Sequence, residues 1–207
     1  MKIIDISWPL SESATAYKDK KTIQCTPVKN FEQHNACESL ITLSSHTGTH
    51  VDAPSHFLKD GTTIDQIPLE SLCGPCAVVD MSHVEECITA KNLEKIDIKS
   101  GTIILFKTRN STRESNAPFD LYFVYLDHSA AEYLCTKKIK AVGIDYLGIE
   151  RNQPAHETHT AFMKNNISII EGLRLQNVNP GNYTLICLPL FLEVLDGAPA
   201  RAILIKQ

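Results

Sequence analysis

The 207-residue chain has no long apolar run, and none of its apolar stretches approaches the roughly 18 residues that a membrane span needs. Asp5 and Pro9 interrupt the first segment, where a secretory signal would need an unbroken apolar stretch. Basic patches are also missing, because the 20 lysines and arginines are dispersed and 24 acidic residues give a net charge of −4. We therefore expect a cytoplasmic protein that binds neither membranes nor nucleic acid and acts on a small molecule.

The seven cysteines are an odd number, scattered through a chain that is large enough to fold without covalent cross-links. Reduced thiols are therefore expected. Hydrophobic residues make up 43% of the chain and charged residues 21%, which is far from the composition of a disordered protein. No repeat or linker is visible, so residues 1–207 are expected to form a single domain with one core.

Short runs of branched residues predict β-strands, because these side chains suit a pleated surface. The runs are Ile3–Ile6, Leu40–Ser44, Ala77–Met81, Thr102–Phe106, Ala141–Ile144, Ile167–Ile170, Thr184–Leu188 and Ala202–Ile205. Helices are expected over Thr89–Lys95, from a capping box at Ser129 to about Lys138, and over Glu157–Asn165. Asp196-Gly197 is a hairpin signal that predicts antiparallel pairing of the last two strands. The expected fold is α/β, with one mixed, barrel-like sheet and packed helices.

Three histidines and an aspartate cluster in His46-Thr-Gly-Thr-His50-Val-Asp52-Ala-Pro-Ser-His56. All four lie at even positions, so they would project from one face of an extended chain. A helix is unfavourable here because the intervening residues are poor helix formers and Pro54 would clash with the carbonyl of His50. The segment is therefore expected to be extended around His50 and Asp52.

A fully extended segment would separate His46 from His56 by roughly 33 Å, so it has to fold back to form one site. Gly48 and Pro54 are the residues that permit such bends. Imidazole nitrogen and carboxylate oxygen suit zinc, manganese or iron(II), and the absence of a thiolate from the cluster favours a site with open coordination positions. The pattern predicts a metal-dependent hydrolase.

This segment resembles the signature of the cyclase family, which includes bacterial kynurenine formamidases, isatin hydrolase and polyketide cyclases. Further similarity lies in Ile4–Leu10, Ala141–Asp145, Ile169–Leu173 and Asp196–Arg201. The resemblance covers nearly the whole chain and implies a swivelling-domain-like fold and a homodimer.

The resemblance also implies a set of metal ligands. His46, His50 and Asp52 would bind one ion, and Asp52 would bridge to a second ion held by His159 and Glu171. His156 lies three residues before His159 and is the alternative ligand, since the family spacing alone favours His159. The expected cofactor is two zinc ions, with manganese as the alternative.

Two ions sharing Asp52 would lower the pKa of a bound water and polarise a substrate carbonyl. His56 resembles the catalytic base and acid of the family; its alternative roles are a fifth ligand or a hydrogen-bond partner of a ligand. An amide or formamide is the favoured substrate, and a lactam, an ester or a polyketide-like molecule is the alternative. Tyr17 stands where the formamidases have a substrate-contacting tryptophan, so it is expected to border the substrate pocket.

Two cysteine patterns offer competing interpretations. Cys73-Gly-Pro-Cys76 has the spacing of a redox pair, but a strand rather than a helix is expected to follow it. Cys73, Cys76, Cys87 and His83 could form a structural zinc site, although the spacing between the second and third ligands is short. A non-enzymatic binding module that retains the metal segment is the remaining alternative.

Overall fold

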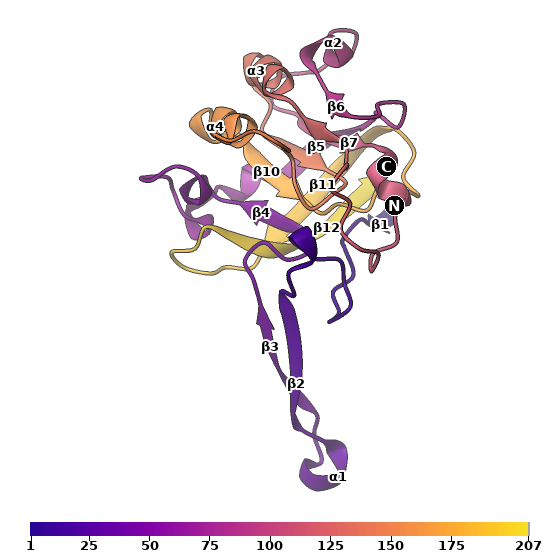
Figure 1. Ribbon diagram of the computed structural model, residues 1–207, viewed down its shortest axis with the longest axis vertical. Coiled ribbons are helices and arrows are strands. Elements are labelled where there is room, and N and C mark those ends of the chain that lie inside the picture. Colours follow the sequence, from indigo (N-terminus) through magenta and orange to yellow (C-terminus); the bar gives the residue numbers. More distant parts are fainter. Residues whose placement is uncertain (207) are drawn as a thin grey trace.

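The computed structural model describes residues 1–206 and has a closed β-barrel at its centre (Figure 1). Its strands are β4 (His50–Asp52), β5 (Cys73–Asp80), β7 (Ile103–Lys107), β9 (Ala141–Ile144), β10 (Ser168–Glu171), β11 (Gly181–Pro189) and β12 (Gly197–Lys206). Their order is β12-β11-β5-β7-β9-β10-β4, and pairing of β4 with the first residues of β12 closes the ring. A further strand, β1 (Lys2–Asp5), pairs with the other end of β12. The predicted mixed, barrel-like sheet is confirmed.

Strand direction divides the barrel into two parts. β5, β7, β9 and β10 run parallel to one another, whereas β11, β12 and β4 pair antiparallel with their neighbours. Parallel neighbours need crossover connections, which here carry α2 (Ala90–Leu93), α3 (His128–Thr136) and α4 (Glu157–Lys164). Figure 1 shows these three helices on one side of the barrel. A short parallel ladder of β6 (Cys87–Ile88) and β8 (Tyr125–Leu126) lies in the same connections.

The apolar core has two layers. One layer fills the barrel and includes Ile103, Leu105 and Ile170, all fully buried. The other lies between the barrel and the helices, where Ile104 packs in the same cluster as Phe162 of α4. Successive strand residues point to opposite faces, so the parallel strands β5, β7, β9 and β10 contribute to both layers, whereas β11 and β12 contribute to the barrel layer. The outward-facing positions of β4 and β10 are therefore directed toward the helical side, and these positions carry the candidate site.

A hairpin arm projects from the barrel opposite the helices (Figure 1). It consists of β2 (Ile23–Lys29) and β3 (Glu38–Leu43), with α1 (Phe31–His34) at its tip. Apolar side chains on the arm are exposed to solvent: Phe31 is 63% exposed and Ile41 57%. The expected homodimer stays a prediction, since the structure contains one copy of the chain.

Short 3-10 helices complete the connections: η1 (Tyr17–Asp19), η2 (Pro54–His56), η3 (Ile64–Gln66), η4 (Leu69–Ser71) and η5 (Arg109–Thr112). Within residues 1–206, no helix has the length and apolar character needed to cross a bilayer.

Each of the predicted strands and helices has a counterpart, with differences at the ends. The predicted capping box at Ser129 is wrong, because Asp127 caps α3 and accepts a hydrogen bond from the backbone N–H of Ala130 at 2.9 Å. Antiparallel pairing of the last two strands is confirmed, but Asp196 and Gly197 do not form a tight turn between them. β11 ends at Pro189 and β12 begins at Gly197, which leaves the Asp196 side chain free to reach the site.

Candidate metal centre

The centre is built on the register between two short strands. β4 pairs antiparallel with β10, and His50 lies directly opposite Glu171. Val51 is fully buried in the barrel interior, so its neighbours His50 and Asp52 point to the outer face, as does Glu171. All three residues are at least 95% buried, with exposed fractions of 2% for His50 and Asp52 and 5% for Glu171.

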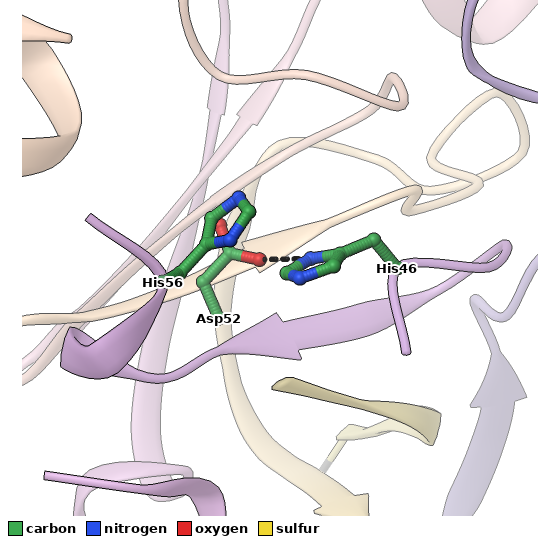
Figure 2. A group of neighbouring side chains, drawn as sticks. All are labelled: His46, Asp52 and His56. Carbon is green, nitrogen blue, oxygen red and sulfur yellow. Dashed lines mark hydrogen bonds and ion pairs between the residues drawn. The ribbon is translucent and has the colours of Figure 1, made fainter. Parts of the chain in front are cut away.

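The chain bends as the sequence predicts on both sides of β4. Gly48 has a φ of +60°, a left-handed conformation that favours glycine, and a Cβ there would lie 2.3 Å from Cδ2 of Leu10. Pro54 occupies the start of η2, where its missing N–H costs no hydrogen bond. These two bends bring His46 and His56 back toward Asp52, which confirms the predicted fold-back of the segment (Figure 2).

His50 is oriented by the backbone beside it. Its Nδ1 lies 2.9 Å from the carbonyl oxygen of Gly48 and can donate a hydrogen bond to it. Nε2 then faces the carboxylates, 3.3 Å from Oδ1 of Asp52 and 3.5 Å from Oε2 of Glu171. A histidine that donates one ring N–H to a carbonyl and presents the other nitrogen to carboxylates has the arrangement of a metal ligand.

Asp52 stands between two groups of histidines. Its Oδ1 lies 2.8 Å from Nδ1 of His46 and 3.3 Å from Nε2 of His50. Its Oδ2 lies 3.5 Å from Nε2 of His159 and is buried without a hydrogen-bond partner. A buried carboxylate oxygen without a partner is costly unless a cation or water satisfies it. The donors present therefore fit divalent ions, and the bridging role of Asp52 stays a prediction.

His156 and His159, the two alternative ligands, lie in different surroundings in the structure. Nε2 of His159 lies 3.3 Å from Oε1 of Glu171, and the residue is 6% exposed. His156 stands at the residue before the helix and pairs instead with Glu150, at 2.5 Å between Nδ1 and Oε1. His159 thus belongs to the cluster around Asp52, whereas His156 lies outside it.

His46 and His56 form the more accessible half of the site, with side chains 21% and 28% exposed. Figure 2 shows both rings beside the carboxylate of Asp52. Their ring centroids lie 4.0 Å apart, and Nε2 of His46 lies 2.9 Å from Oδ2 of Asp196. The same carboxylate oxygen is 3.6 Å from Nδ1 of His56, and Ser45 donates a hydrogen bond to the other oxygen at 3.1 Å. Asp196 was missed as a site residue because its Asp-Gly pattern indicates a turn.

Charge pairing among these side chains shifts their pKa values. Burial would lower the pKa of His50, but Asp52 and Glu171 raise it to about 10. Burial and the charge of Asp52 would raise the pKa of Glu171, but its contacts with His159 and His50 lower it to about 2. Burial lowers the pKa of His56. Protonated imidazoles thus supply the positive charge beside the two carboxylates. A metal cation can supply this charge in place of the ring protons.

The cluster opens on a cavity of about 430 Å³, within the usual size range of small-molecule sites. Tyr17 lines this cavity and packs edge-to-face on Phe119 with ring centroids 4.9 Å apart. Gly148 also lines it, and a Cβ at this position would lie 3.5 Å from Cε2 of Tyr17. The predicted place of Tyr17 at the pocket agrees with this geometry, and its contact with substrate stays a prediction.

The cysteine patterns lie apart from this centre. Cys73 and Cys76 are both within β5, so the helix that a reactive redox pair needs is replaced by a strand. Burial raises the pKa of Cys76 to about 12, which keeps its thiol protonated. Among residues 1–206, the side-chain groups that could hold an ion do not include Cys73, Cys76, Cys87 or His83.

A mixed barrel with a buried cluster of histidines and carboxylates, open to a small-molecule cavity, defines a protein with a candidate divalent-metal centre. A family model described as "Putative cyclase" matches residues 4–151. The chain belongs to this cyclase family.

Relatives and solved structures agree with this assignment. A kynurenine formamidase of Salinibacter ruber is 32% identical over 99% of the chain and 97% of its own length. Cyclase-like protein 3 of Oryza sativa subsp. japonica is 39% identical over 83% of the chain, and the match covers 66% of that protein. A structure described as a predicted metal-dependent hydrolase from Bacillus stearothermophilus is 42% identical, with a TM-score of 0.88 over 98% of this chain and 97% of that one.

Proposed function

We propose that the protein is a metal-dependent hydrolase that cleaves the amide or formamide C–N bond of a small molecule. One observation carries this proposal: two buried histidines, His50 and His159, converge on Asp52 and Glu171 beside a cavity of about 430 Å³. The unpartnered Oδ2 of Asp52 supports the use of a metal. The full-length similarity to a kynurenine formamidase supports an arylformamidase-like reaction.

The residues that would hold the ions lie around the two carboxylate oxygens of Asp52. His46 and His50 lie beside Oδ1, and His159 lies beside Oδ2. Glu171 lies 3.3 Å from Nε2 of His159 and 3.5 Å from Nε2 of His50. Zinc suits these nitrogen and oxygen donors, and manganese is the alternative. When bound, such ions polarise a carbonyl group and lower the pKa of a water molecule.

His56 is the group that would move the proton. It lines the cavity, and Asp196, at 3.6 Å, can orient its ring through Nδ1. In the proposed reaction His56 accepts a proton from the attacking water while the oxygen–carbon bond forms. It then returns this proton to the leaving nitrogen as the C–N bond breaks, which gives an amine and a carboxylic acid that loses its remaining proton to solvent.

The cavity wall indicates which acyl or aryl groups could bind. Tyr17 and Phe57 line the cavity with aromatic rings, and Leu147 and Gly148 add apolar surface to its wall. An aromatic ring bearing the amide could stack in this space, with the Tyr17 hydroxyl available to a polar edge. This is the basis for preferring an aryl amide or formamide.

Turnover by metal-depleted and reloaded protein tests the proposal. Aryl formamide hydrolysis should be lost after chelation and restored by zinc or manganese, and Asp52→Asn should abolish the restored activity. Asp60→Asn changes an exposed aspartate eight residues away and is the matched control. Hydrolysis of esters or lactams but not of amides would select the alternative substrates. Failure of the loaded protein to turn over any of these substrates would favour a binding module.

A further inference from the structure

Glu150 is a buried acidic residue beside the metal centre, and it lines the same cavity. It follows β9 and is 7% exposed. Its Oε2 accepts a hydrogen bond from the backbone N–H of His159 at 3.1 Å and lies 3.0 Å from Nδ1 of the same residue. The latter contact is an ion pair in which the ring N–H does not point straight at the oxygen, since Nδ1 makes no aligned hydrogen bond. Glu150 therefore touches both the backbone and the ring of His159.

The two nitrogens of His159 face different partners. Nε2 faces the candidate metal centre, 3.5 Å from Oδ2 of Asp52 and 3.3 Å from Oε1 of Glu171. Nδ1 faces Glu150 on the opposite side of the ring. A histidine that binds a metal through one nitrogen keeps a proton on the other, and a carboxylate next to that proton fixes the ring orientation and makes the ligand more basic.

We propose that Glu150 is a positioning residue that holds the proton of His159 on Nδ1 and directs the lone pair of Nε2 toward the second ion. The inference rests on the proposed metal-dependent function. It adds a residue that is not an ion ligand and acts through His159.

His156 keeps Glu150 in place from the other side. Its Nδ1 lies 2.5 Å from Oε1 of Glu150, so each carboxylate oxygen of Glu150 has a histidine partner. The ring of Phe57 stacks on His156 with centroids 4.1 Å apart and lies 4.6 Å from the ring of His159. This packing limits the positions that the Glu150 side chain can take. His156 thus supports the positioning residue.

Glu150, His156 and His159 could instead bind an ion of their own, because their ligand atoms lie within 4.8 Å of one another. His159 would then have to use Nδ1 for that ion and Nε2 for the centre, which requires an imidazole without either ring proton. Loss of the second proton from an imidazole is far less favourable than loss of the first. The geometry therefore favours the positioning role.

Zinc affinity provides the test, and it needs no turnover. Glu150→Gln and Glu150→Ala are titrated with zinc in competition with a chromophoric chelator, alongside Glu132→Gln, an exposed acid on α3, as the control. The weaker ion should lose about 10–100-fold in affinity in Glu150→Ala and less in Glu150→Gln, which keeps an oxygen acceptor. The ion beside His46 and His50 should keep its affinity, and this also shows that the variants are folded.

A second readout follows the proton itself. In zinc-loaded protein labelled with ¹⁵N-histidine, His159 should give the NMR signature of a protonated Nδ1, and Glu150→Gln should shift that signal. Unchanged affinities and an unchanged His159 signal in both variants would overturn the role of Glu150 alone. A third ion that is lost in His156→Ala would also overturn it, by making Glu150 a ligand. A wild-type chain that binds no zinc would contradict the inference and the proposed function together.

Discussion

Removal of metal should make the stability of the protein fall as the pH rises. Burial would lower the pKa of His50, but its contacts with Asp52 and Glu171 raise it from 6.5 to about 10 in the folded chain. A raised folded-state pKa gives stability that is fully present below the unfolded value of 6.5 and is lost as the pH rises toward the folded value. The pKa values of His46 and His159 are also raised by neighbouring carboxylates, so these residues act in the same direction.

The size of this loss of stability follows from the difference between the pKa of His50 in the folded chain and in the unfolded chain. Between pH 6.5 and pH 9 the unfolded chain releases a proton that the folded chain keeps, over about 2.5 pH units at roughly 1.36 kcal/mol each. The upper limit for this one group is therefore about 3.4 kcal/mol, a large share of the stability of a typical domain.

Urea unfolding in excess chelator at pH 6.5, 7.5 and 9 measures the effect. The free energy of unfolding of the metal-free wild type should fall across this range, and His50→Gln should show a smaller fall because it lacks the titrating group. Saturating zinc should abolish or reverse the slope, since zinc binds deprotonated imidazole. A metal-free wild type whose stability stays constant or rises with pH would refute the argument.

Four substitutions test the residue roles. Asp52→Ala should lose both ions and His159→Ala mainly one, because Asp52 faces both groups of ligands; equal losses in elemental analysis would argue against a bridging carboxylate. His56→Ala should retain its metal while turnover slows by about 10²–10⁴-fold, and loss of metal would reassign His56 as a ligand. Tyr17→Trp should change the relative rates on N-formylkynurenine, isatin and simple aryl formamides by about 10–200-fold at unchanged metal content. An identical ranking in both enzymes would place Tyr17 outside the pocket.

The candidate ligands on the metal segment could be found from the sequence because their chemistry is local. His46, His50 and Asp52 lie within seven residues, and Gly48 and Pro54 mark the bends that bring the segment together. The strands were also predictable, since their runs of branched residues form the buried layers of the barrel. Family spacing favoured His159 over His156, and burial beside Asp52 agrees with that choice.

Long-range partners could not be found in this way. Asp196 reaches His46 across 150 residues of sequence, and its Asp-Gly pattern indicates a turn. Glu150 carries no local signal at all, because its role depends on how α4 packs beside the segment after β9. β4 is three residues long, too short to predict from periodicity, although its register with β10 sets His50 opposite Glu171.

Anomalous X-ray diffraction from crystals of the zinc-loaded protein tests the central claim most directly. Two zinc peaks are expected, one beside His46 and His50 and one beside His159 and Glu171, with Asp52 in contact with both. A single peak, or zinc bound away from Asp52, would contradict a two-ion hydrolase centre on β4 and β10.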